Sequence, residues 1–284
     1  MNNTNIEAQF QIEKKYSKQN IREWMLREFA AADDSEFKYQ VRELIELIGH
    51  ECAVELLLVV LRTQFQSIQS VVSQLAGNFD GDNIFEKVDA ATEMVVKVAK
   101  TIDIFNIVIK ESVDETGEPH EVVYIRSNYD LGKEILQKIS DTLYIPPMVC
   151  EPRKLYENTD SVYLTREDHV ILKGVNQHDG YQALDALNII NAVPLALDLR
   201  MLFEDEAPKK PLNTIEKREN FERMVNSSKS VVQIILDNDN RFHLNHKYGK
   251  RGRMYEDSHH VGLQKNCYRK SQIRLADEEI IPLD

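Results

Sequence analysis

The sequence predicts a mainly α-helical chain with small β-hairpins, an α+β fold. Two patterns predict it. Apolar residues recur three or four positions apart through residues 41–48, as on one face of a helix. From residue 102 the period changes, and residues 102–109 together with the β-rich run 121–126 are typical of paired strands. At 284 residues the chain is long enough for one large domain or two moderate ones.

Three helices are expected before the first strands. They cover residues 8–30, 36–73 and 83–100, and the Gly-, Asn- and Asp-rich residues 77–82 form a turn before the third. Residues 53–61 are the most apolar run, but a run this short is typical of a buried helix and predicts no membrane span. The polar N-terminus predicts no signal peptide.

A β-hairpin is predicted over residues 102–126, with a long tip that contains Gly117 and Pro119. Ser127 and Asp130 have the spacing of a capping box and predict the start of a helix over residues 131–144. The two prolines that follow this helix end it.

The second half begins with a small hairpin formed by residues 162–164 and 169–173. A long helix is predicted over residues 180–203, and Pro194 must kink or split it because proline donates no backbone hydrogen bond. Residues 204–211 are charged and contain prolines, which makes them the best candidate for a domain boundary. A further helix over residues 213–236 stops at residues 237–240, and an acidic tail covers residues 277–284.

The basic end of the chain is its most informative stretch. Residues 241–274 contain nine Lys and Arg and two acids, in a chain whose net charge is -12. Such a cluster of positive charge in an acidic chain predicts a phosphate-rich partner, although a basic loop is more often a solvated surface. Arg251, Gly252 and Arg253 are expected in a turn between strands 242–244 and 254–255, where the guanidinium groups can contact phosphates.

Catalytic and metal motifs are weak. Three distant cysteines predict no disulfide framework and a reducing compartment. His178 and Asp179 are better explained by a helix cap than by a metal site. A zinc site remains a minor alternative, because adjacent histidines point to opposite faces of a strand. Its candidate ligands are His243, His246, His259, His260 and Cys267. No carboxylate set has the spacing to hold two Mg²⁺ ions, so the sequence predicts binding rather than catalysis by this chain.

Three stretches, in the same order, resemble the bacteriophage-type single-subunit RNA polymerases. Residues 145–152, Ile-Pro-Pro-Met-Val-Cys-Glu-Pro, are similar to the segment that ends the family's N-terminal domain. Residues 187–202 are similar to a family helix with a Leu-Asn and a Pro-Trp, with Leu195 in place of the Trp. Residues 251–255, Arg-Gly-Arg-Met-Tyr, resemble the Arg-Gly-Arg-Val-Tyr core where the family's thumb meets its palm. Gly249 stands where the family has an Asp, and the residues that match the following positions are Gln264, Asn266 and Lys270.

The resemblance implies parts of a right-hand polymerase: an N-terminal domain over residues 1–203, a reduced thumb over 204–240 and the first palm strands over 241–284. The family's metal-binding aspartates have no counterpart here. The resemblance is therefore to the small subunit of the heterodimeric RNA polymerases of N-four-like bacteriophages, and it implies a larger catalytic subunit that carries Mg²⁺, with no cofactor in this chain. It also implies contacts with template DNA and the RNA–DNA hybrid, in the cytoplasm of the infected bacterial host. The residues it assigns to nucleic acid are Arg251, Gly252, Arg253, Tyr255, Lys265 and Lys270.

The hairpin over residues 102–126 falls where the family places its strand-separating hairpin. The candidate residues at the tip are Glu111, Val113, Asp114 and Glu115. Acidic side chains repel duplex phosphates, so the sequence predicts that a helper protein, either single-stranded-DNA-binding or promoter-recruiting, is needed. Two alternatives stay open: a non-enzymatic transcription accessory protein that binds nucleic acid, and a helical interaction protein that does not.

Overall fold

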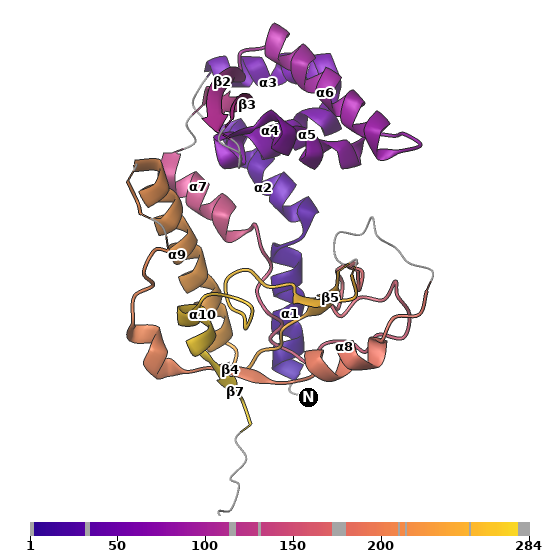
Figure 1. The fold of residues 1–284 in the computed structure, drawn as a ribbon, viewed down its shortest axis with the longest axis vertical. Coiled ribbons are helices and arrows are strands. Elements are labelled where there is room, and N and C mark those ends of the chain that lie inside the picture. The colour runs from indigo at the N-terminus through magenta and orange to yellow at the C-terminus, as the bar shows by residue number, and fades with distance from the viewer. Residues whose placement is uncertain are drawn as a thin grey trace, which may run out of the picture. The chain divides into compact units, whose positions relative to one another are not determined.

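The computed structural model describes residues 3–31, 35–113, 118–129, 132–171, 180–209, 211–213, 215–249 and 251–277. The chain is a mixture of α-helices and small antiparallel β-sheets, which confirms the α+β class (Figure 1). It divides into two compact units. The central unit is Ile21–Ile139, and the discontinuous unit combines Met1–Asn20 with Ser140–Asp284.

The helices of the central unit pack around one apolar core. They are α2 (Lys18–Ala31), α3 (Ser35–Ile48), α4 (His50–Thr63), α5 (Ile68–Leu75), α6 (Ile84–Thr101) and α7 (Gly132–Asp141). The apolar run 53–61 lies within α4 and is largely buried, as the sequence predicts. The side chain of Asn83 caps α6 by accepting hydrogen bonds from the Phe85 and Glu86 N–H groups at 2.9 and 3.1 Å. The helix expected over residues 83–100 is thereby confirmed.

Two expected long helices are broken, so those predictions were wrong. The segment 8–30 forms α1 (Asn3–Lys15) and α2, with a break at Tyr16 and Ser17. The segment 36–73 forms α3, α4, a short strand and α5. Both breaks in the segment 36–73 occur at residues with positive φ, a conformation that a helical backbone does not allow. Gly49 (φ +81°) separates α3 from α4, and Gln64 (φ +60°) ends α4.

The predicted hairpin is confirmed as β2 (Phe105–Val113) paired with β3 (Pro119–Ser127), and β1 (Phe65–Ser67) adds a third strand beside β3. The tip residues Asp114 and Glu115 lie outside the described residues. Ser127 does not begin α7 as expected, because it ends β3 and its hydroxyl accepts a hydrogen bond from the Tyr129 N–H at 3.1 Å. The helix itself is present from Gly132.

In the discontinuous unit, Pro194 splits the expected helix 180–203. The chain forms α8 (Leu184–Asn191), β4 (Leu195–Leu197) and a 3-10 helix (Leu199–Phe203) instead. The next helix, α9 (Ile215–Leu236), ends at Asp237–Asn240 as predicted. Asp239 and Asn240 take positive φ there. The remaining elements are β5 (His246–Tyr248), β6 (Met254–Glu256), α10 (Cys267–Ser271) and β7 (Ile273–Leu275).

The hairpin expected from residues 162–164 and 169–173 is absent from the described residues up to Ile171, so this prediction was wrong. Glu13, on α1, organises this segment instead. Its buried carboxylate accepts hydrogen bonds from the N–H groups of Leu164 and Thr165 at 2.9 and 2.6 Å. A side chain from a distant helix therefore replaces strand partners that local pairing would have supplied.

The predicted boundary at residues 204–211 contains no helix or strand among its described residues. The division at residues 203 and 240 into polymerase-like parts stays a prediction. Among the described helices, none combines the length and hydropathy that crossing a membrane requires.

Candidate nucleic-acid interface

The basic turn is a tight connection between β5 and β6, which pair antiparallel. The Gly249 N–H donates to the Arg253 carbonyl at 2.8 Å, and the Gly252 N–H donates to the Gly249 carbonyl at 2.9 Å. Gly252 has φ +69°, a conformation that glycine adopts without strain. The turn and its second strand were predicted, but the first strand was placed four residues too early.

Residues 242–244 were expected to form the strand before the turn, but they pair with segments from elsewhere in the chain. His243 exchanges two backbone hydrogen bonds with Met148, at 3.1 and 2.8 Å. Phe242 does the same with Leu195, at 2.8 and 2.9 Å. These residues therefore form bridges between chain segments, whereas the strand that leads into the turn is β5.

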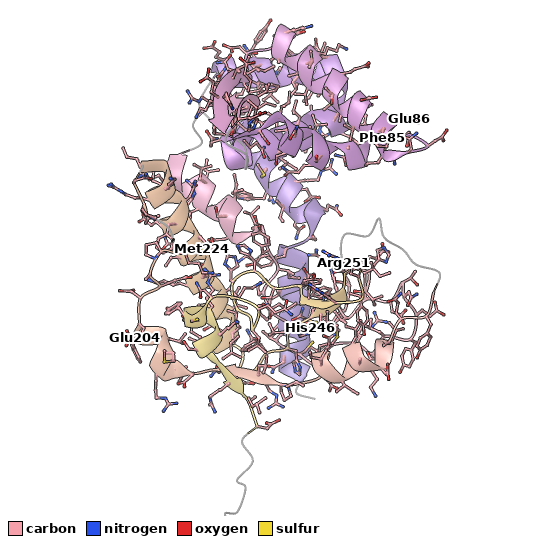
Figure 2. The ribbon with its side chains drawn as sticks, in the orientation of Figure 1. Phe85, Glu86, Glu204, Met224, His246 and Arg251 are labelled. Carbon is pink, nitrogen blue, oxygen red and sulfur yellow. The ribbon has the colours of Figure 1, made fainter. Side chains whose placement is uncertain are left out.

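The turn projects from a buried base (Figure 2). All three residues of β5 are buried, and the Tyr248 hydroxyl donates to the Ala183 carbonyl at 3.0 Å. Arg251, Gly252 and Arg253 are exposed. Two guanidinium groups on a short turn above fixed strands are preorganised to contact an anionic partner, because little backbone order must be gained on binding.

Lys247 holds the buried strand β5 in place by ion pairing. Its Nζ lies 2.7 Å from carboxylate oxygens of both Asp168 and Asp257. The lysine side chain is only 10% exposed, so the two carboxylates compensate for the desolvation of its ammonium group. Lys247 is consequently part of the structure that supports the turn and is withdrawn from any ligand.

Three further cations of the basic segment form ion pairs with acidic side chains. Arg241 pairs with Asp277 at 2.8 Å, Lys265 with Glu256 at 3.2 Å, and Arg269 with Glu206 at 3.0 Å. The local charge of the sequence therefore overstates what a ligand would meet. Among the predicted contact residues, the exposed cations are Arg251, Arg253 and Lys270, and Tyr255 is 37% exposed.

Glu256, at the end of β6, holds the loop that follows the hairpin. Its fully buried carboxylate accepts hydrogen bonds from the N–H groups of Leu263 and Gln264 at 2.7 and 3.0 Å, besides pairing with Lys265. A Cβ at Gly262 would collide with this carboxylate. Only glycine fits there because the loop backbone closes directly onto the acid.

Gly262→Ala should destabilise the discontinuous unit by about 1–3 kcal/mol, since the added methyl group displaces Glu256 from its hydrogen-bond donors. Urea unfolding of the full-length protein measures the change. Gly77→Ala is the matched control, because nothing lies within 4 Å of the corresponding position there. Equal stability of both variants and the parent protein would contradict this account of the loop.

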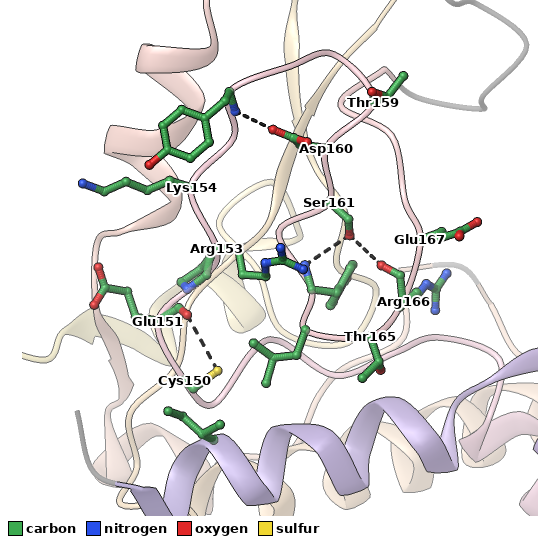
Figure 3. A pocket seen from close by; sticks show the side chains of 15 residues that line it. Cys150, Glu151, Arg153, Lys154, Thr159, Asp160, Ser161, Thr165, Arg166 and Glu167 are labelled. Atoms are coloured by element: carbon green, nitrogen blue, oxygen red, sulfur yellow. Dashed lines mark hydrogen bonds between the residues drawn. The ribbon is translucent and has the colours of Figure 1, made fainter.

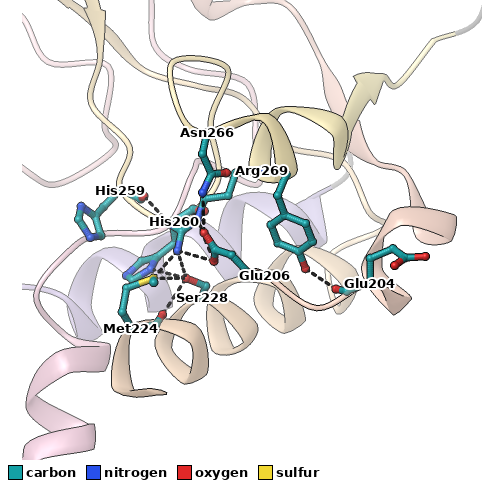
Figure 4. Close-up of polar contacts among 9 residues, drawn as sticks. Glu204, Glu206, Met224, Ser228, His259, His260, Asn266 and Arg269 are labelled. Atoms are coloured by element: carbon teal, nitrogen blue, oxygen red, sulfur yellow. Dashed lines mark hydrogen bonds and ion pairs between the residues drawn. The ribbon is translucent and has the colours of Figure 1, made fainter. Parts of the chain in front are cut away.

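Arg269 joins four segments of the discontinuous unit (Figure 4). Its guanidinium group donates to Glu206 through Nε at 3.1 Å and Nη2 at 3.0 Å, in a side-on pair. It also donates to the Ser228 hydroxyl on α9 and to the His260 carbonyl, at 3.1 and 3.2 Å. Asn266 caps α10 and donates to the same Glu206 at 2.7 Å.

The histidines of this region are held neutral. Burial lowers the pKa of His259 to about 4 and that of His260 to about 3, and the charge of Arg269 adds to both effects. His259 stacks on Tyr144 with ring centroids 3.7 Å apart. Burial also lowers the pKa of His246, whose Nδ1 lies 3.0 Å from Asn191 Oδ1. In the described part of the chain, no group of three or more His, Cys, Asp or Glu side chains could hold a metal ion.

A pocket of about 670 Å³ opens beside α1 (Figure 3). Burial raises the pKa of Cys150 in its wall to about 11, so the thiol is protonated at neutral pH and is a poor nucleophile. Asp160 accepts hydrogen bonds from the Tyr156 and Glu157 N–H groups, which lower the pKa of its carboxyl. The charged lining residues are three bases and three acids, a balance that favours neither sign of ligand: Arg153, Lys154, Arg166, Glu151, Asp160 and Glu167.

The first two stretches that carry the polymerase resemblance bond to residues 242–246, and the third is paired with the strand β5 at the end of this segment. Met148 from the first stretch and Leu195 from the second bond to His243 and Phe242 as described above. Asn191, also in the second stretch, accepts a hydrogen bond from the His246 N–H at 2.9 Å through its buried side chain. Segments about fifty and a hundred residues apart in the sequence are thus bonded to the residues that lead into the basic turn.

Sequence reasoning missed the buried acids that build this region. Glu13, Glu206 and Glu256 look like ordinary surface residues, because each has a charged neighbour in the sequence. No local pattern distinguishes them, since their partners lie elsewhere along the chain. Only the cap formed by Asn266 has a local signal, an Asn just before a short helix.

No protein-family model and no curated protein matches this chain. The residues themselves therefore carry the functional argument.

Proposed function

We propose that this chain is the smaller subunit of a split DNA-directed RNA polymerase of the bacteriophage single-subunit type. In this role it contacts template DNA and the RNA–DNA hybrid, and a larger partner subunit carries out nucleotidyl transfer. The observation that supports the proposal best is that the first two polymerase-like stretches bond to residues 242–246, while β5 pairs with Met254 and Tyr255 of the third stretch.

The chemistry proposed for the turn is electrostatic positioning. Guanidinium groups form paired hydrogen bonds to phosphate oxygens, so Arg251 and Arg253 would hold the backbone of the template or hybrid. Lys270, on α10, and Tyr255, on β6, are also exposed. Lys265 would contribute less directly than the sequence suggests, because Glu256 already neutralises it. Such contacts fix register and orientation without moving a proton.

Nucleotidyl transfer requires carboxylates that hold Mg²⁺ ions. Among the described residues, no group of three or more His, Cys, Asp or Glu side chains could hold a metal ion. The proposal places the Mg²⁺ ions on the partner subunit, and no catalytic step is assigned to this chain.

The proposal also includes a helper protein and the cytoplasm of an infected bacterium as the place of action. Glu111 is exposed near the tip of the β2–β3 hairpin, where its charge opposes approach of a duplex. A single-stranded template is therefore expected to be used better than a linear duplex. A helper that binds single-stranded DNA or recruits the enzyme to a promoter would supply the opening.

Arg251→Ala together with Arg253→Ala should weaken binding of an RNA–DNA hybrid to the full-length chain by the same factor for different sequences. The slope of log affinity against log salt concentration should fall by about 2, one for each lost phosphate contact. Fluorescence anisotropy of a labelled hybrid measures both quantities. Lys229→Ala, an exposed cation on α9, is the matched control and should change neither.

Activity itself is tested by co-expressing the chain with the protein encoded by the neighbouring gene. The expected result is a stable complex that extends RNA on single-stranded DNA with Mg²⁺, with less product on linear duplex. RNA synthesis by this chain alone would refute the split-enzyme proposal. Hybrid binding that depends on Arg251 and Arg253, but with no complex formed, would favour a transcription accessory protein instead.

A further inference from the structure

One face of the three-stranded sheet in the central unit carries two aromatic rings and two cations. Phe65 on β1 stacks on Tyr124 of β3, with ring centroids 4.8 Å apart and an interplanar angle of 8°. The Lys110 Nζ on β2 lies 4.3 Å from the Phe65 centroid and 5.7 Å from the Tyr124 centroid. The Arg126 guanidinium carbon is 5.4 Å from the Phe65 centroid. Both cations are within the range of cation–π attraction.

The strand register assigns these four residues to a single face. Directly opposed residues of an antiparallel pair share a face, and side chains alternate along each strand. Phe65 opposes Arg126, Tyr124 opposes Val108, and Lys110 opposes Val122. We name this the outward face, because none of its members belongs to the buried core of the central unit. Its described register positions are Phe65, Ser67, Asn106, Val108, Lys110, His120, Val122, Tyr124 and Arg126.

Glu111 and Glu121 oppose each other on the other face of the hairpin. That face also contains Phe105 and Ile125, which are buried in the core. Residues 21–139 as a whole contain 22 Asp and Glu against 12 Lys and Arg. The outward face therefore differs in charge from the rest of this acidic unit, because its register positions include two cations and no acid.

We infer that the outward face binds a single-stranded nucleic acid, with bases on the Phe65–Tyr124 pair and phosphates on Lys110 and Arg126. Aromatic rings on a sheet are a platform on which unpaired bases stack, and neighbouring cations follow the sugar-phosphate backbone. Lys110 and Arg126 are exposed, so their charged ends can turn from the rings to phosphates when a base arrives. A duplex would satisfy this face poorly, because its bases are already stacked and paired.

The inference concerns the central unit and does not rest on the proposed polymerase role. It changes the interpretation of the hairpin, however. The resemblance implies strand separation by the hairpin, with a tip whose acids repel duplex phosphates, whereas the geometry points to the side of the sheet, where single strands would be held after they separate.

The test is the binding of a fluorescein-labelled deoxythymidine oligonucleotide of about 20 nucleotides to the full-length chain, followed by anisotropy. All proteins carry Arg251→Ala and Arg253→Ala, which removes the other proposed contact. Tyr124→Leu should weaken binding by about tenfold or more, because a base loses its stacking partner. Tyr124→Phe keeps a ring and should bind as the parent does, so the comparison separates stacking from a general loss of structure.

Lys110→Ala tests the electrostatic part without altering a ring. It should lower the slope of log affinity against log salt concentration by about 0.7, the value for one phosphate contact on a single strand. Lys100→Ala is the matched control, an exposed cation at the end of α6. A ribouridine oligonucleotide should bind in the same way, because stacking does not require a particular sugar.

Three results would overturn the inference: no binding of either oligonucleotide, unchanged binding by both Tyr124→Leu and Lys110→Ala, or duplex binding as tight as single-strand binding. These results would say nothing about Arg251 and Arg253, because both arginines are replaced by alanine in every protein of the series. Conversely, the hybrid-binding experiment with Arg251→Ala and Arg253→Ala can fail while the sheet still binds a single strand.

Discussion

Glu206→Gln should destabilise the discontinuous unit by about 3–5 kcal/mol, the largest effect of any single substitution considered for this protein. The Glu206 and Arg269 side chains are only 7% and 8% exposed. Removal of the carboxylate charge leaves the guanidinium group buried without a counter-ion. Urea unfolding of the full-length chain, followed by circular dichroism, provides the measurement.

Glu204→Gln serves as the matched control, because Glu204 is an exposed acid two residues away. It should leave the unfolding midpoint nearly unchanged. The double variant Glu206→Leu with Arg269→Met should recover much of the lost stability, since an apolar pair avoids the cost of burying charge. A double variant less stable than Glu206→Gln would show that the hydrogen bonds from Arg269 to Ser228 and His260 matter more than the ion pair.

Glu13→Gln should destabilise the same unit by about 3 kcal/mol, because the amide cannot accept every hydrogen bond that the carboxylate accepts. Besides the Leu164 and Thr165 N–H groups, the Thr165 hydroxyl donates to Glu13 at 2.7 Å and Gln9 donates at 3.0 Å. Glu7→Gln, on the exposed side of the same helix, is the control. Urea midpoints at neutral pH give the difference.

The same carboxylate predicts a dependence of stability on pH. Burial raises the pKa of Glu13, but hydrogen bonds from Leu164, Gln9 and Thr165 outweigh burial and hold the pKa below its ordinary value of 4.5. A lowered pKa in the folded state means that the unfolded chain binds the proton more readily. The stabilisation is therefore complete above pH 4.5 and is lost as pH falls from there through the lower pKa of the folded state.

Urea midpoints measured from about pH 6 to about pH 3 test this dependence. The parent protein should lose more stability across the interval than Glu13→Gln, because the variant has no carboxyl to protonate at this position. Parallel curves for the two proteins would contradict the assigned role of Glu13.

The sequence by itself was enough for elements whose signals are local. Asn83 caps α6, and the turn residues 237–240 end α9, where both Asp239 and Asn240 take positive φ. The period-two pattern identified the β2–β3 hairpin, and the glycine between Arg251 and Arg253 identified the basic turn. Local signals failed at Gly49 and Gln64, because a single residue with positive φ divides a segment whose apolar pattern continues across the break.

The candidate site was predictable only in part. The position and exposure of Arg251 and Arg253 follow from the turn, but the availability of the other cations does not. Whether Lys247, Lys265 or Arg269 is exposed depends on carboxylates that lie up to 79 residues away in the sequence, as Asp168 does from Lys247. Charge counted along a chain measures composition, whereas a ligand meets only the charge that folding leaves unpaired.

The sequence determined which residue types this protein has for binding phosphate and which backbone turn presents two of them. Tertiary structure alone decided which cations pair with buried acids, and it alone placed Phe65 beside Tyr124 from strands nearly sixty residues apart. The physical reason is the range of the interactions involved. Capping, turn formation and strand alternation act between near neighbours in the chain, while ion pairing and ring stacking depend on contacts that exist only after the elements have packed.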